Sequence, residues 1–313
     1  MKQVVAFLKL IRWPNLFFIL LTQLLFHQAI IHPILSGTQN HPAIDGWLLI
    51  LLVVASVIIA AAGYIINDYF DINIDQVNKP HENVVDRIVS RRWAMAWHFI
   101  LSGIGLMISL LISWKTGFWY IVIGNFFCVL LLFAYSVSLK RKLLSGNILI
   151  SALTAWVILV IGISEVNILS TPTLGQVEAA NKIIRISFLY AAFAFISSLI
   201  REAIKDIEDM QGDQRYGCRT MPIVWGVNAS KVYIAVWLVV VLALLVVLQV
   251  YVFRFGWWWA MVYSVIFIMA PFIIIFQRLF KANNKSDYHQ LSKLTKFVML
   301  TGILSMIFFY FYL

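Results

Sequence analysis

Nine stretches of this chain are long enough and apolar enough to cross a lipid bilayer. We place these stretches near residues 13–32, 46–66, 93–113, 117–138, 146–168, 183–203, 229–253, 257–277 and 293–313. About 20 residues of α-helix cross the hydrocarbon core. Because backbone polar groups cannot stay unpaired in lipid, helices are the spanning form that such stretches can adopt. We therefore expect an all-α, polytopic membrane protein with about nine transmembrane helices, which forms a single domain over residues 1–313.

Composition agrees with this class, and the distribution of charge gives an orientation. The chain is 62% hydrophobic and only 12% charged, unlike a soluble domain. Most lysines and arginines precede the first span or follow the second, fourth, sixth and eighth spans. By the positive-inside rule, we expect an integral protein of the plasma (inner) membrane with a cytoplasmic N-terminus. The net charge of +10 then faces membrane lipids and anionic substrates, and predicts no nucleic-acid partner.

Two acidic triplets with the same spacing interrupt this apolar background. They are Asp68, Asp71 and Asp75 after the second span, and Asp206, Asp209 and Asp213 after the sixth. Spacing of i, i+3 and i+7 puts each triplet on one face of a helix. We expect both helices to continue past the membrane surface, one as far as Pro80 and the other as far as Gly217.

Carboxylates this close repel one another, and a divalent cation relieves that repulsion. Hard oxygen ligands suit Mg²⁺, which takes one or two carboxylates and fills its shell with water and phosphate oxygens. We expect Mg²⁺ as the cofactor, held by all six aspartates around one diphosphate group. Stabilising the negative charge that develops on the diphosphate makes it a good leaving group.

Basic residues near the triplets, and one in the intervening loop on the same side of the membrane, are candidate phosphate ligands. They are Lys79, Arg87, Lys140, Arg201 and Lys205. Arginine can hold a phosphate through two hydrogen bonds, whereas lysine acts as a point charge. Metal-binding acids and phosphate-binding bases above a membrane-embedded bundle predict a substrate with an anionic head and a long apolar tail. A prenyl diphosphate fits this description, and Asn67 and Tyr135 are placed close to the bond that would ionise.

These motifs resemble those of the UbiA superfamily of membrane prenyltransferases. The family pattern NDxxDxxxD is present from Asn67 to Asp75, and DxxxD from Asp209 to Asp213. Tyr135, Lys140 and the pair at 146–147 look like further family features, and the resemblance covers nearly the full chain. It implies a helical bundle around a central cavity that opens sideways to lipid, with cytoplasmic loops as a cap.

Within the superfamily, the stretch from Arg201 to Gly226 looks most like geranylgeranylglycerol-phosphate geranylgeranyltransferases. This likeness implies transfer of a geranylgeranyl group to a glycerol-phosphate lipid in ether-lipid synthesis, with Glu202 or Asp209 as a candidate base. One segment departs from the pattern. Where many relatives read Arg-Pro-hydrophobic-Pro-Ser-Gly, residues 82–90 contain neither proline nor glycine. This segment borders the acceptor side, so the identity of the acceptor stays open.

Three alternatives remain beside this interpretation. Within the same class, the acceptor could be aromatic, such as a quinone precursor or a porphyrin. A cation-coupled membrane transporter would use acidic residues too, but transporters bind near the bilayer midplane and these triplets lie at helix ends. A non-catalytic lipid-binding scaffold would have degenerate motifs, whereas both motifs are complete. Glu165, near the end of the fifth span, is costly to bury, and we expect it at the outer interface.

Overall fold

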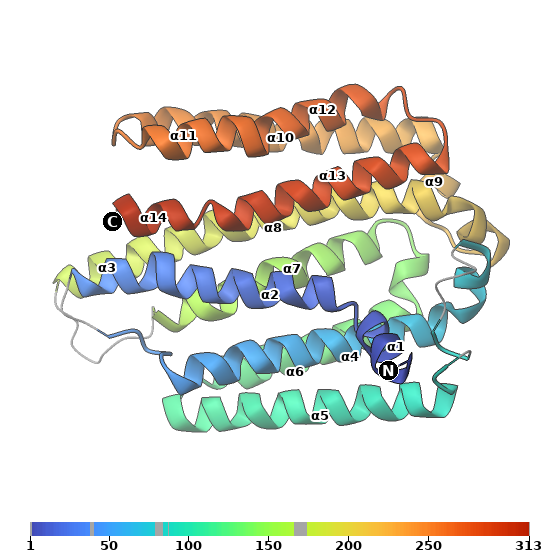
Figure 1. Ribbon diagram of the computed structural model, residues 1–313, viewed down its shortest axis with the longest axis horizontal. Helices are drawn as coiled ribbons and strands as arrows, with labels where there is room; N and C mark the ends of the chain where they lie inside the picture. Colours follow the sequence, from blue (N-terminus) through green and yellow to red (C-terminus); the bar gives the residue numbers. More distant parts are fainter. Residues whose placement is uncertain (1, 38–40, 79–83, 87, 166–173, 313) are drawn as a thin grey trace.

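The computed structural model describes residues 2–37, 41–78, 84–86, 88–165 and 174–312 (Figure 1). Two of the candidate phosphate ligands, Lys79 and Arg87, lie outside these residues. The helices are α1 (Lys2–Leu10), α2 (Trp13–Leu25), η1 (Phe26–Ile31), α3 (His32–Ser36), α4 (Trp47–Asn78), α5 (Arg91–Thr116), α6 (Trp119–Val137), η2 (Leu139–Arg141), α7 (Ser145–Gly162), η3 (Ile163–Glu165), α8 (Leu174–Arg215), α9 (Met221–Val224), α10 (Val227–Phe253), α11 (Trp258–Ser264), η4 (Val265–Met269), α12 (Ala270–Leu279), α13 (Lys285–Leu304) and α14 (Ile307–Tyr312). Within the described ranges the fold is all-α, as expected.

Nine helical segments of the described chain are long and apolar enough to cross a membrane, and each coincides with one of the nine expected spans. Two of them are much longer than a bilayer requires. α4 has 32 residues and α8 has 42, whereas about 20 residues cross the hydrocarbon core. Both helices therefore carry their acidic triplets on turns beyond the apolar stretch, as the sequence predicts.

The spanning helices lie side by side along the long axis of the molecule, and successive helices run in opposite directions (Figure 1). This alternation gathers α1, η2, α9, the end of α4 and the start of α13 at one end of the molecule, at the right in Figure 1. The loops richest in lysine and arginine lie at this end, together with both triplets. The C-terminus lies at the opposite end.

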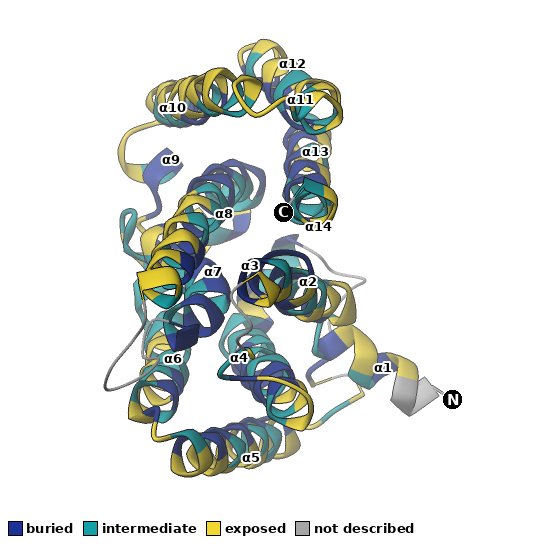
Figure 2. Cartoon of the chain, turned by 90° about the vertical axis from the view of Figure 1, so that its left-hand side faces the viewer, coloured by how far each residue is buried: buried dark blue, intermediate teal, exposed yellow. Residues whose placement is uncertain are grey.

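Large apolar side chains cover the outward faces of the bundle. Figure 2 shows the helices nearly end-on, with exposed residues along the outer sides of α5 and α10. Trp114 on α5 is 76% exposed and Val247 on α10 is 67% exposed. Contiguous apolar surface of this kind is unfavourable in water and suits contact with lipid chains.

Glu165 corrects one expectation from the sequence. It lies at the end of the bundle opposite the triplets, but its side chain is 0% exposed rather than open to the interface. The backbone N–H of Ala43 donates to both carboxylate oxygens, at 3.2 and 3.1 Å. A backbone donor from the segment before α4 thus replaces water, which makes burial of this carboxyl group tolerable.

Candidate active site

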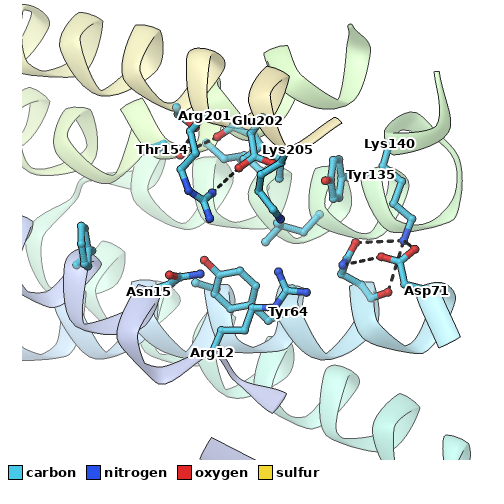
Figure 3. A pocket seen from close by; sticks show the side chains of 18 of the residues that line it. Arg12, Asn15, Tyr64, Asp71, Tyr135, Lys140, Thr154, Arg201, Glu202 and Lys205 are labelled. Atoms are coloured by element: carbon cyan, nitrogen blue, oxygen red, sulfur yellow. Dashed lines mark hydrogen bonds and ion pairs between the residues drawn. The ribbon is translucent and has the colours of Figure 1, made fainter. Parts of the chain in front are cut away.

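A pocket of about 330 Å³ lies among α2, α4, α6, α7, α8 and α13, at the end of the bundle that carries the triplets (Figure 3). Within the described part of the chain, six carboxylate and six lysine or arginine side chains line it. Apolar side chains, including Phe18, Leu132 and Met299, line it as well. The pocket therefore offers charged and apolar surface together, as an amphiphilic ligand requires.

Most of the residues singled out from the sequence meet in this pocket. Those that line it are Asn67, Asp71, Asp75, Tyr135, Lys140, Arg201, Glu202, Lys205, Asp206, Asp209 and Asp213. Asp68 does not line the pocket. Among the candidates that the structure describes, it is the one that lies apart from the others.

Asp71 is held by an ion pair and a hydrogen bond. Lys140 Nζ lies 2.6 Å from Asp71 Oδ1, and Asn67 Nδ2 donates to Asp71 Oδ2 at 2.8 Å (Figure 3). Lys140 also donates to Asn67 Oδ1 at 3.1 Å. Burial lowers the pKa of Lys140 below its ordinary value, and the charge of Asp71 opposes this shift. One lysine thus fixes both the amide and the carboxylate of the first motif.

Gly146 explains how Lys140 comes to face α4. A Cβ atom at position 146 would lie 2.9 Å from the Cα of Lys140 and 3.2 Å from the ring of Tyr135. α7 can therefore begin directly against the η2 turn only with glycine at this position. The next residue, Asn147, donates from Nδ2 to Asp206 Oδ2 at 2.8 Å. The Gly-Asn pair noted in the sequence thus acts on both aspartate helices. Gly146 lets Lys140 reach Asp71 on α4, and Asn147 binds Asp206 on α8.

Asp68 pairs with Arg12, a residue that the sequence analysis did not identify. Arg12 Nη2 lies 2.7 Å from Asp68 Oδ1, and its guanidinium group lies 5.2 Å from the centre of the Tyr64 ring. Arg12 joins α1 to α2 in a left-handed backbone conformation, with φ of 51°. The charge of Asp68 raises the pKa of Arg12 above its ordinary value. The ion pair ties the N-terminal segment to α4.

The second triplet approaches the first across the pocket. Asp213 lies within electrostatic reach of both Asp209 and Asp71. Arg201 Nη1 donates to Glu202 Oε1 at 2.6 Å, and Lys205 extends from α8 into the pocket (Figure 3). α8 therefore contributes both anionic and cationic groups to the wall opposite α4.

Asn78 ties the two aspartate helices together. Its Nδ2 donates to the Asp209 carbonyl at 3.0 Å, and the Gly212 N–H donates to Asn78 Oδ1 at 3.1 Å. Lys285 Nζ, from the start of α13, donates to the Asn78 carbonyl at 2.7 Å. A Cβ atom at Gly212 would lie only 2.5 Å from the Asn78 amide. We call Asn78 with Gly212 the helix clamp, because together they fix the separation of α4 and α8 beside the triplets.

The donor set fits Mg²⁺ bound together with a diphosphate. Among the described residues no three Asp, Glu, His or Cys side chains are grouped closely enough to hold a metal ion by themselves. Magnesium does not require such a group, because it keeps several waters and binds through one or two carboxylates plus phosphate oxygens. Five aspartates on two facing helices supply oxygen ligands of this kind, and nearby cations supply contacts for the phosphate.

Comparison with known proteins gives the same class of protein that the sequence motifs predict. Residues 33–311 match the UbiA prenyltransferase family. The digeranylgeranylglyceryl phosphate synthase of Methanosphaera stadtmanae is 28% identical over 90% of this chain and 92% of its own length. The synthase of that name from Thermococcus sibiricus is 35% identical over 61% of this chain and 60% of its own.

Solved structures share the fold. One, from a study of digeranylgeranylglyceryl phosphate synthase in membranes, has a TM-score of 0.64 and 25% identity, covering 98% of this chain and 99% of its own. A UbiA homologue from Archaeoglobus fulgidus, bound to GPP and Mg²⁺, has a TM-score of 0.56 and 13% identity, covering 96% and 99%. The arrangement of helices around the two aspartate motifs, and the extent of the family match, make this chain an integral membrane prenyltransferase of the UbiA family.

Proposed function

We propose that this protein transfers the geranylgeranyl group of geranylgeranyl diphosphate to geranylgeranylglycerol phosphate, and that it requires Mg²⁺. The observation that carries the proposal is the meeting of both aspartate motifs in one pocket that also has apolar walls. The names of the relatives support the choice of acceptor. The Archaeoglobus homologue with bound GPP and Mg²⁺ supports the choice of cofactor.

The reaction exchanges one carbon–oxygen bond for another. The bond between C1 of the prenyl chain and the diphosphate oxygen breaks, and its electron pair leaves with diphosphate. The acceptor hydroxyl oxygen then bonds to C1, and its proton passes to a base, for which Glu202 and Asp209 are the candidates. The ring of Tyr135 faces the pocket and would stabilise the allylic cation.

Two groups of charged side chains would hold the donor, one through Mg²⁺ and the other by direct contact with phosphate oxygens. Asp68, Asp71, Asp75, Asp206, Asp209 and Asp213 would hold Mg²⁺, which supplies stabilisation of negative charge on the departing diphosphate. Lys140, Arg201 and Lys205 would bind phosphate oxygens, together with Lys79 and Arg87. Asn67 would keep Asp71 oriented through the hydrogen bond described above. Asp68 must exchange its ion pair with Arg12 before it can contribute.

Transfer from radiolabelled geranylgeranyl diphosphate in nanodiscs tests the proposal. We expect labelled ether lipid with geranylgeranylglycerol phosphate when Mg²⁺ is present, and none when EDTA replaces it. Product with an aromatic acid acceptor alone would keep the mechanism and overturn the acceptor. Release of diphosphate without a prenylated product from either acceptor would indicate a functional donor site whose acceptor is a third compound. No release from folded protein would favour a transporter or a scaffold.

We also propose that the end of the bundle bearing the triplets faces the cytoplasm, in the plasma (inner) membrane. The concentration of lysine and arginine at this end supports that orientation. It can be tested with single cysteines after Cys128 and Cys218 are replaced by alanine. In intact cells a membrane-impermeant maleimide should label Arg254→Cys, at the opposite end, and should label Lys281→Cys only after permeabilisation. The reverse pattern would overturn the orientation.

A further inference from the structure

A second cleft adjoins the pocket and has a different charge balance. It has a volume of about 930 Å³ and lies among α1, α2, α4, α8 and α13. The two cavities share part of their walls, including Asp75, Arg201 and Lys296. We call the first cavity the donor pocket, because it is proposed to hold the prenyl diphosphate; a ligand in the cleft would lie directly beside it.

Cations outnumber carboxylates in this cleft. Among the residues that the structure describes, seven lysine or arginine side chains line it against three carboxylates, whereas the first pocket has six of each. Asp68 pairs with Arg12, and Glu208 accepts from His289 Nδ1 at 2.8 Å. The cleft thus keeps a surplus of positive charge, which an anion without a metal ion would balance.

Much of this surplus comes from one face of α13. Lys285, His289, Lys293 and Lys296 follow one another at intervals of four, four and three residues, so their side chains lie on the same side of the helix. Lys285 donates to the Asn78 carbonyl and Lys296 to Asn15 Oδ1, each at 2.7 Å. Both partners are neutral, so these bonds position the ammonium groups without cancelling their charge. Lys293 is exposed and lines the cleft.

Apolar surface completes the cleft. Val5, Leu8 and Trp13 line it from α1 and the start of α2, and Val5 and Trp13 are 64% and 56% exposed. Val84 and Val85 also line it. They belong to the segment that lacks the prolines and glycine of many relatives. A ligand that fits this cleft carries an anionic group and apolar chains.

We propose that this cleft binds the phosphate monoester of the acceptor lipid, with Lys285, Lys293 and Lys296 as its ligands. The inference rests on the proposed function and adds the place where the acceptor head is held. Two anionic substrates would repel each other in one pocket, and separate cationic surfaces lower that cost. With its phosphate on α13, the acceptor can extend its hydroxyl across the shared wall towards C1 of the donor.

Charge reversal at Lys293 tests the inference. In nanodiscs of phosphatidylcholine, we expect Lys293→Glu to raise the KM for geranylgeranylglycerol phosphate by about tenfold or more. The KM for geranylgeranyl diphosphate should stay within about twofold, because the donor is held in the neighbouring pocket. Geranylgeranylglycerol has the same chain and no phosphate, and its inhibition constant as a competitor should be unchanged. Lys281→Glu, an exposed lysine outside both cavities, is the matched control.

Several results would overturn the inference. They are an unchanged acceptor KM, an equal rise in the donor KM, or an equal rise in the inhibition constant of the alcohol. A rise in the acceptor KM that occurs only in nanodiscs containing phosphatidylglycerol would indicate that the cleft binds anionic membrane lipid and not the acceptor. A wild-type protein that makes no product with this acceptor would instead contradict the proposed function itself. Product from wild type with an unchanged acceptor KM in Lys293→Glu would contradict the inference alone.

Discussion

Asp206→Asn is expected to lower kcat/KM for prenyl transfer by about a thousandfold while the protein stays folded. The substitution keeps the size of the side chain, and the new amide oxygen can still accept the hydrogen bond from Asn147 Nδ2. It removes one negative charge from the site proposed to hold Mg²⁺ and the leaving diphosphate. Loss of one group that stabilises developing charge costs about a hundredfold to a thousandfold, and loss of metal affinity adds to this. Initial rates at several Mg²⁺ concentrations measure the effect.

Glu178→Gln is the matched control for this prediction. Glu178 is exposed near the start of the same helix, α8, and lines neither cavity. The Glu178→Gln substitution makes the same change of charge, and it should leave the transfer rate within about twofold of the wild-type rate. Thermal unfolding in detergent should give similar midpoints for both variants and wild type. Near-normal transfer by folded Asp206→Asn would contradict the metal-binding role proposed for the second triplet.

Gly212→Ala is expected to lower the transfer rate by about a hundredfold through the helix clamp. An added methyl group would meet the Asn78 amide at 2.5 Å, so either α8 must move away from α4 or the amide must leave its two hydrogen bonds. Either change separates the triplets, and small misplacements of reacting groups are costly to catalysis. Overpacking of this kind also lowers the free energy of unfolding by about 1–3 kcal/mol. Transfer rates and thermal unfolding of the variant measure both effects.

Two further variants separate the clamp from a general effect of alanine. Gly103 on α5 has no neighbouring atom within 4 Å of an added Cβ, so Gly103→Ala should leave activity unchanged. Its stability should rise by up to about 1 kcal/mol, from helix propensity alone. Adding Asn78→Ala to Gly212→Ala removes the clash and should restore stability, but not activity, because the hydrogen bonds are still missing. Full activity in the double variant would show that the clamp does not position the triplets.

The spans and the triplets could be predicted because both are local patterns. A run of about 20 apolar residues identifies a membrane helix wherever it packs, and a spacing of three and four residues identifies one helix face. Lys140 and Tyr135 could be named from charge and placement and again from the family resemblance, whereas Asn147 was within reach of the sequence only through that resemblance. Their contacts with Asp71 and Asp206 depend on how α6 and α7 pack beside α4 and α8.

Other parts of the site carry no local signal. Arg12, Asn15 and Asn78 act through partners that are distant in the sequence: Arg12 meets Asp68, Asn15 meets Lys296, and Asn78 meets Gly212. Asp68 shows the limit of reasoning from spacing. It shares the helical face predicted for its triplet, yet Arg12 pairs with it on the side of the neighbouring cleft. Glu165 shows the same limit, since only the tertiary fold brings the Ala43 N–H to it.

The helix clamp also bears on how the protein responds to its membrane. Asn78 fixes α4 and α8 to each other outside the apolar stretch, where bilayer thickness and lateral pressure act least. The wall formed by α2 and α13 is joined near this end by the hydrogen bond between Asn15 and Lys296. Away from that hydrogen bond, α2 and α13 lie within the bilayer. Lipid composition should therefore alter the rates at which long-chain substrates enter and leave beside α2. The chemical step should proceed at the same rate in thin and in thick bilayers.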